Sequence, residues 1–82
     1  MVWIDEFAAA LGVEPLAPEE RRLLLDLARR VAHGTERVNA PLASYLVGRS
    51  VAGRSDPVGG VREAARRAEA SLPPAAREPG GR

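Results

Sequence analysis

Four side chains that could do chemistry lie within twelve residues of one another, at Asp26, Arg29, His33 and Arg37. Spacings of three and four residues place the first three along one side of a helix, and Arg37 follows in the connecting loop. Guanidinium and imidazole donors held together in this way suit a phosphate or carboxylate, with Asp26 orienting one of the donors. The pattern predicts a site that binds an anionic ligand or a partner at this corner.

The same residues also allow a structural interpretation. Asp26 could pair with Arg22 or Arg30, each pair worth about 0.3–0.5 kcal/mol. His33 could cap the last helical turn, and Arg37 could donate to its free carbonyls. Asp26 and His33 are two turns apart, roughly 10 Å along the axis, which is too far for a direct acid–base pair. The sequence leaves the structural and binding interpretations open and predicts no catalytic residue.

The composition excludes several classes of site. The chain of 82 residues is long enough for one domain. It has no cysteine and one histidine, which rules out disulfides and leaves any zinc site short of ligands. The formal net charge of +1 is too small to indicate nucleic acid or an anionic membrane as a partner. No apolar run approaches the ~20 residues that span a bilayer, and no signal-like segment is seen, so we expect a cytoplasmic protein without a cofactor.

Charge is distributed unevenly along the chain. Residues 1–40 carry five arginines and seven acidic residues, a net charge of −2. Residues 41–82 carry seven arginines and four acidic residues, a net charge of +3. The two halves could attract each other within one fold or between the two chains of a homodimer.

Apolar residues spaced three and four apart predict an all-α fold. Helices are expected over residues 3–11, 18–33, 39–52 and 57–72. We expect a compact four-helix domain over residues 1–72 with short connections. The run from 73 to 82 is rich in proline and glycine, which predicts a disordered tail.

The helix ends carry recognisable signals. Asn39 and Asp56 are candidate N-terminal caps, and prolines fit the first turns that follow. Gly12, Gly34 and Gly53 are candidate terminators.

Each expected helix has a candidate core face. Gly48, in the middle of the third helix, predicts a close helix crossing, because glycine there otherwise costs about 1 kcal/mol. Leu25 points away from the stripe of the second helix, which indicates a second covered surface. The expected core residues are Ile4, Phe7, Ala8 and Leu11; Leu23, Leu24, Leu27, Ala28 and Val31; Leu42, Tyr45, Leu46 and Ala52, with Val47 beside them; and Val58, Val61, Ala65, Ala68 and Leu72.

The central part of the chain resembles a family of small domains of unknown function from high-GC bacteria. Members occur alone or attached to the guanylyltransferase-like protein of molybdopterin-guanine dinucleotide biosynthesis. The likeness covers about residues 2–70, and its pattern is held here by Trp3, Leu11-Gly12, Asp26-Leu27-Ala28-Arg29, Ala32-His33-Gly34, Arg37, Ala40-Pro41-Leu42 and Leu46-Val47-Gly48. The resemblance supplies no catalytic residues, and the phosphate-binding motif of the nucleotidyltransferase is absent.

The resemblance implies a non-enzymatic accessory module of molybdenum-cofactor biosynthesis. Such a module would bind the guanylyltransferase-like protein, or a phosphate-bearing ligand, through Asp26, Arg29, His33 and Arg37. Two alternatives remain open. One is a homo-oligomerisation domain. The other is a weak helix-turn-helix-like nucleic-acid binder, which is disfavoured because Arg49 is the only charged residue of the would-be recognition helix.

Overall fold

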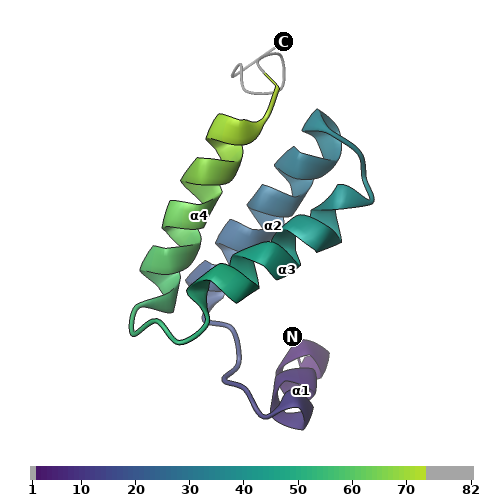
Figure 1. Cartoon of the computed structure of the whole chain (residues 1–82). Coiled ribbons are helices and arrows are strands. Elements are labelled where there is room, and N and C mark those ends of the chain that lie inside the picture. Colours follow the sequence, from purple (N-terminus) through teal and green to yellow (C-terminus); the bar gives the residue numbers. More distant parts are fainter. Residues whose placement is uncertain (1, 74–82) are drawn as a thin grey trace.

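The computed structural model describes residues 2–73, which form four α-helices and no strand (Figure 1). The all-α prediction is confirmed, and every predicted helix end lies within one residue of the observed one. The predicted disordered tail, except Pro73, lies outside the described residues. The helices are α1 (Val2–Leu11), α2 (Pro18–Gly34), α3 (Asn39–Val51) and α4 (Pro57–Ser71).

Gly12, Gly53 and Asp56 act at helix ends as expected. The prediction that Gly34 terminates α2 is wrong, because Gly34 is the last residue of that helix and has no positive φ. After α1, Gly12 adopts a positive φ of +75°. Its N–H donates to the Ala9 carbonyl and the Val13 N–H donates to the Ala8 carbonyl, both at 3.0 Å, which is the Schellman arrangement. At the start of α4, the Asp56 carboxylate accepts from the Gly59 N–H at 3.0 Å and so caps the helix.

The corner between α2 and α3 is closed by a residue that the sequence reading overlooked. The backbone N–H and the hydroxyl of Thr35 both donate to the Val31 carbonyl, at 2.9 and 2.7 Å. Asn39 was expected to cap α3, which is wrong: Val38 is the N-cap residue, without a side-chain hydrogen bond. The Asn39 amide instead donates to the Thr35 hydroxyl at 3.1 Å. These local bonds fix the turn.

The hydrophobic core lies where α2, α3 and α4 meet. Leu27 and Val31 of α2, Val47 of α3 and Val61 of α4 form its buried cluster. All three pairs of these helices pack together. The close approach occurs at Gly60, where an added Cβ would lie 2.8 Å from Cγ1 of Val51. It does not occur at Gly48, where a Cβ would meet nothing within 4 Å, so the predicted crossing at Gly48 is wrong.

The core face predicted for α3 is also wrong. Val47 is only 7% exposed, whereas Leu42 is 61% and Tyr45 65% exposed. The inward face carries small or β-branched side chains, including Ala43 and Val51, which pack against the core cluster. Small side chains let α3 approach its neighbours closely enough for dense packing. The larger residues therefore point outward.

Helix α1 lies apart from the other three (Figure 1). No helix packs against it as α2, α3 and α4 pack against one another. Ala8 is buried and Ile4 half-buried, as predicted, but Phe7 and Leu11 are exposed. One ion pair, Arg21 to Asp5 at 3.6 Å, links α1 to α2. The fold is thus a three-helix core with a peripheral amphipathic helix.

Candidate functional site

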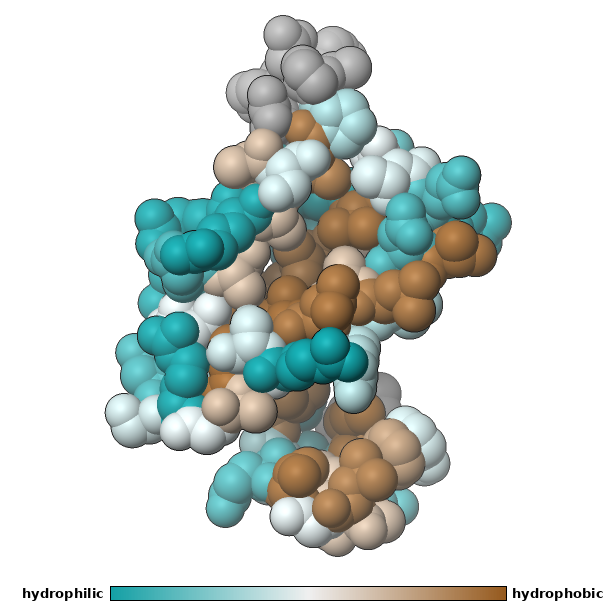
Figure 2. Space-filling model, viewed as in Figure 1, coloured by the Kyte–Doolittle hydropathy of each residue, from teal (hydrophilic) through white to brown (hydrophobic). Residues whose placement is uncertain are grey.

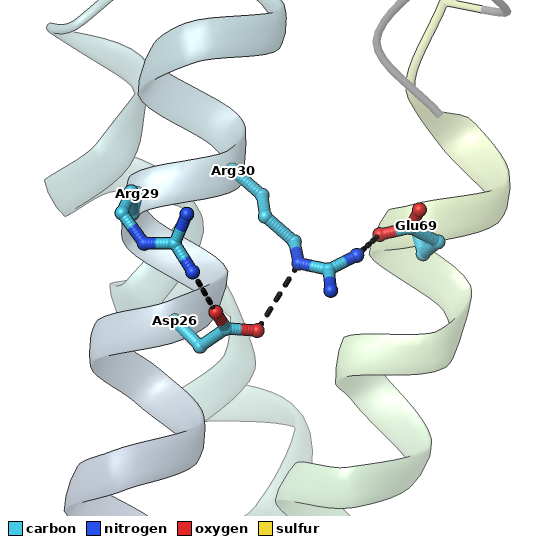
Figure 3. Close-up of polar contacts among 4 residues, drawn as sticks. All are labelled: Asp26, Arg29, Arg30 and Glu69. Atoms are coloured by element: carbon cyan, nitrogen blue, oxygen red, sulfur yellow. Dashed lines mark hydrogen bonds and ion pairs between the residues drawn. The ribbon is translucent and has the colours of Figure 1, made fainter. Parts of the chain in front are cut away.

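Asp26 is the centre of a polar network that joins α2 to α4 (Figure 3). One of its carboxylate oxygens accepts from the Arg29 guanidinium, and the other accepts from Nε of Arg30 at 3.1 Å. Arg30 also donates through Nη1 to Glu69 of α4. The predicted pairing of Asp26 with Arg30 is therefore observed. Arg30 thus connects the carboxylate of Asp26, on its own helix, with that of Glu69, which lies 39 residues further along the chain on α4.

The two carboxylates act on the protonation of Arg30. The hydrogen bond that Arg30 donates to Glu69, followed by the charges of Glu69 and Asp26, raises the pKa of the Arg30 guanidinium above its already high ordinary value. Arg30 is therefore a permanent cation at any physiological pH. Its side chain is half exposed, and that of Asp26 is nearly so, so water and salt screen these pairs and each contributes little to stability.

A shallow pocket lies beside this network, between α2 and α4. Its volume is about 220 Å³. The buried side chains Leu27 and Val31 contribute apolar wall, and Asp26, Arg30 and Glu69 contribute polar wall. These groups and Arg29 bind one another, so the two carboxylates are balanced by two guanidinium groups of the same chain. The network joins two helices and offers few free donors.

The structure separates the four predicted site residues into two pairs. Asp26 and Arg29 are bonded to each other. His33, in the last turn of α2, and Arg37, in the loop, are both exposed. Within residues 2–73 their side chains form no hydrogen bond or ion pair. The predicted assignment of Asp26, Arg29, His33 and Arg37 to ligand or partner binding stays a prediction.

Sequence reasoning missed the contacts between helices. Arg30 meets Glu69, and Arg62 of α4 meets Glu19 of α2, which also binds Arg22. The only available signal was the opposite charge of the two halves of the chain, which fits the Arg62 to Glu19 pair. Helical spacing carries no information about partners on another helix.

The surface of the domain exposes an unusual number of large apolar side chains. One face of α3, which we call the α3 stripe, exposes Val38, Leu42, Tyr45 and Leu46, each by more than half. A second row, the α1 stripe, exposes Trp3, Phe7 and Leu11. Figure 2 shows hydrophobic residues gathered over α3 and, across a notch, over α1, while hydrophilic residues cover α4. Contiguous exposed apolar patches on a small domain mark interaction surfaces.

Aromatic contacts order both stripes. Trp3 and Phe7 stack with ring centroids 5.1 Å apart and an interplanar angle of 16°. On α3, the Arg49 guanidinium lies over the Tyr45 ring, 5.1 Å from its centroid, within the range of a cation–π contact. An apolar pocket of about 330 Å³ adjoins the α1 stripe, lined by Trp3, Ile4, Leu16, Arg21, Leu24 and Leu25. The exposed Leu25 therefore faces α1.

The described part of the chain contains neither a membrane-spanning helix nor a cluster of metal ligands. None of its helices combines the length and the apolar character needed to cross a membrane. Within residues 2–73 no three side chains of the histidine, cysteine, aspartate and glutamate types lie close enough to hold a metal ion.

Comparison with known protein families identifies the family of this chain. Residues 1–79 match the family described as Domain of unknown function (DUF6457). The chain belongs to this family. The match covers all four helices of this DUF6457 domain. No curated protein and no solved structure gives a significant match.

Proposed function

We propose that this DUF6457 domain is a non-catalytic protein-binding module and that the α3 stripe is its docking surface. The observation that carries the proposal is the position of Leu42, Tyr45 and Leu46 on the face of α3 opposite its buried face, with Val38 exposed just before the helix. A helix of a monomer normally keeps one apolar face, toward the core. The second face has no role in the core, and covering it would release its apolar area from water.

The proposed partner is the guanylyltransferase-like protein of molybdopterin-guanine dinucleotide biosynthesis. The resemblance of residues 26–48 to domains attached to that protein supports this choice. The run includes all four residues at the α2–α3 corner that we expect to bind, and it extends through the whole α3 stripe. Arg37 immediately precedes Val38, and His33 lies four residues before Arg37, so these two polar side chains would form a polar rim at one end of the stripe. A cytoplasmic location belongs to the same proposal.

A protein partner fits the geometry better than a phosphate-bearing ligand does. Asp26 engages Arg29, and Asp26 and Glu69 together engage Arg30. This leaves His33 and Arg37 as the donors at the corner that have no partner within the described residues. Tight phosphate sites use several converging donors and bidentate arginines.

The proposal is tested by calorimetric titration of the purified guanylyltransferase-like protein with this domain. We expect a 1:1 complex that Leu42→Ser and Tyr45→Ser weaken at least about tenfold, because each removes apolar area from the interface. Arg37→Ala should weaken it less, since rim charges contribute little. Arg66→Ala on α4 is the matched control and should leave affinity unchanged. Absence of binding by the native domain contradicts the proposal.

A separate experiment tests whether the α2–α3 corner binds a phosphate-bearing ligand instead. A thermal-shift series with GTP and inorganic phosphate should leave the melting temperature unchanged. If either raises it in the native chain but not in Arg37→Ala or His33→Ala, the corner is a ligand site and the protein-binding proposal gives way to it.

A further inference from the structure

The two exposed stripes match in length and spacing. The α1 stripe places Trp3, Phe7 and Leu11 four residues apart. The α3 stripe repeats the same spacing with Val38, Leu42 and Leu46. Each row extends over eight residues, about 12 Å along a helix axis. Side chains four apart form a ridge, and the ridges of one helix fit into the grooves between the ridges of another, so the two stripes are geometrically suited to each other.

The charges beside the stripes are complementary. The segment 2–17, which contains α1, has three carboxylates and no arginine. The segment 37–55, which contains α3, has three arginines and no carboxylate. Within the described residues only Asp5 of these six has an ion-pair partner. The six charged residues are Asp5, Glu6 and Glu14, and Arg37, Arg49 and Arg54.

Within one chain the stripes do not cover each other. Helix α1 does not pack on α3 as α2 and α4 do, and both stripes remain exposed. Figure 1 shows α1 displaced from α3, with the six-residue connection before α2 leading away from it. The α1 stripe, with carboxylates beside it, and the α3 stripe of the same length, with arginines beside it, therefore both remain uncovered within one chain.

We infer that a second copy of this chain covers the α3 stripe with its α1 stripe, and that the contact is reciprocal. In this two-fold dimer each copy gives α1 and receives α1, so both stripes of both chains are buried in one closed assembly. The carboxylates beside α1 face the arginines beside α3. The inference rests on the proposed function, because the second copy covers the same protein-binding surface, and the two occupants would therefore compete for the α3 stripe.

The first test uses the full chain alone. Sedimentation velocity over about 1 µM to 1 mM should show a monomer passing to a dimer and no larger species. Trp3 is the only tryptophan and is 62% exposed, so its fluorescence should shift to the blue over the same range. Leu42→Ser should raise the dissociation constant at least about tenfold, with an unchanged circular dichroism spectrum because Leu42 contributes nothing to the core cluster.

The second test reverses charges on one stripe at a time. Glu6→Arg with Glu14→Arg, and separately Arg37→Glu with Arg49→Glu, should each weaken self-association about tenfold or more at low salt. Mixing the two variants should restore association, because both α1–α3 contacts of the mixed dimer then join opposite charges. Arg66→Glu with Arg67→Glu on α4 is the control that changes the net charge as Arg37→Glu with Arg49→Glu does, and it should not weaken the dimer.

Three results would overturn the inference: a strict monomer at the highest concentration, no recovery on mixing, or equal weakening by the α4 control. Each is distinct from a failure of the proposed function. A chain that stays monomeric but binds the guanylyltransferase-like protein refutes the dimer alone. A chain that dimerises but does not bind that protein refutes the proposed partner alone.

Discussion

One face of α3 is buried and the opposite face is exposed, although both faces are apolar. The inward face, with Ala43, Val47 and Val51, packs into the core between α2 and α4. The outward face carries Leu42 and Tyr45, which are bulkier, yet both are mostly exposed. The difference shows that burial on α3 depends on how closely the neighbouring helices approach a face, and not on the hydrophobicity of its single residues. Small side chains permit dense contact between backbones, and the larger ones remain available for another molecule.

The sharpest way to break this comparison is to shorten one side chain on each face. Val47→Ala should lower the free energy of unfolding by about 2 kcal/mol, because it removes two buried carbons and leaves a cavity. That corresponds to roughly 10 °C in melting temperature for a domain of this size. Leu42→Ala should change stability by less than about 0.5 kcal/mol. Urea unfolding of dilute chain measures both, and similar losses would contradict the assignment of faces.

The close approach at the inward face is tested at Gly60. A methyl group there would lie 2.8 Å from Cγ1 of Val51 and 3.2 Å from the Arg54 side chain. Gly60→Ala should therefore destabilise the domain by about 1 kcal/mol, since the overpacking of a stiff valine exceeds the gain in helix propensity. A melting temperature that rises in this variant would show that α4 and α3 are not in tight contact.

Gly48 provides the converse test on α3. An added Cβ would meet nothing within 4 Å, and the residue lies in the middle of the helix. Gly48→Ala should raise the free energy of unfolding by up to about 1 kcal/mol, which is the difference in helix propensity. Thermal unfolding should show the gain without any change in the dissociation constant of the dimer. A loss of stability would mean that a neighbour packs there after all.

The smallest effect concerns the ordered contact on the outward face. Arg49→Gln removes the cation that lies over Tyr45. Because the site is exposed, the free energy of unfolding should fall by only about 0.5 kcal/mol, measured at concentrations where the chain is monomeric. A loss approaching that of Val47→Ala would show that the outward face supports the fold instead of serving association.

Local features of the fold were predictable and distant ones were not. Gly12 and Asp56 mark helix ends through bonds to residues at most four positions away, so sequence spacing revealed them. Thr35 is equally local, but a threonine at the C-terminal end of a helix is a weak signal and was overlooked. Of the candidate site, the contacts of Asp26 with Arg29 and Arg30 follow helical spacing, whereas Glu69 could not have been chosen among the acidic residues.

The sequence by itself determined where the helices begin and end, because caps, terminators and apolar periodicity act over one or two turns. It did not determine which face of α3 is buried, since both faces are apolar and periodicity only places them opposite each other. The tertiary structure decided this, because α2 and α4 can approach only the face that has small side chains. The same packing brought Arg30 to Glu69 and left the α1 and α3 stripes exposed.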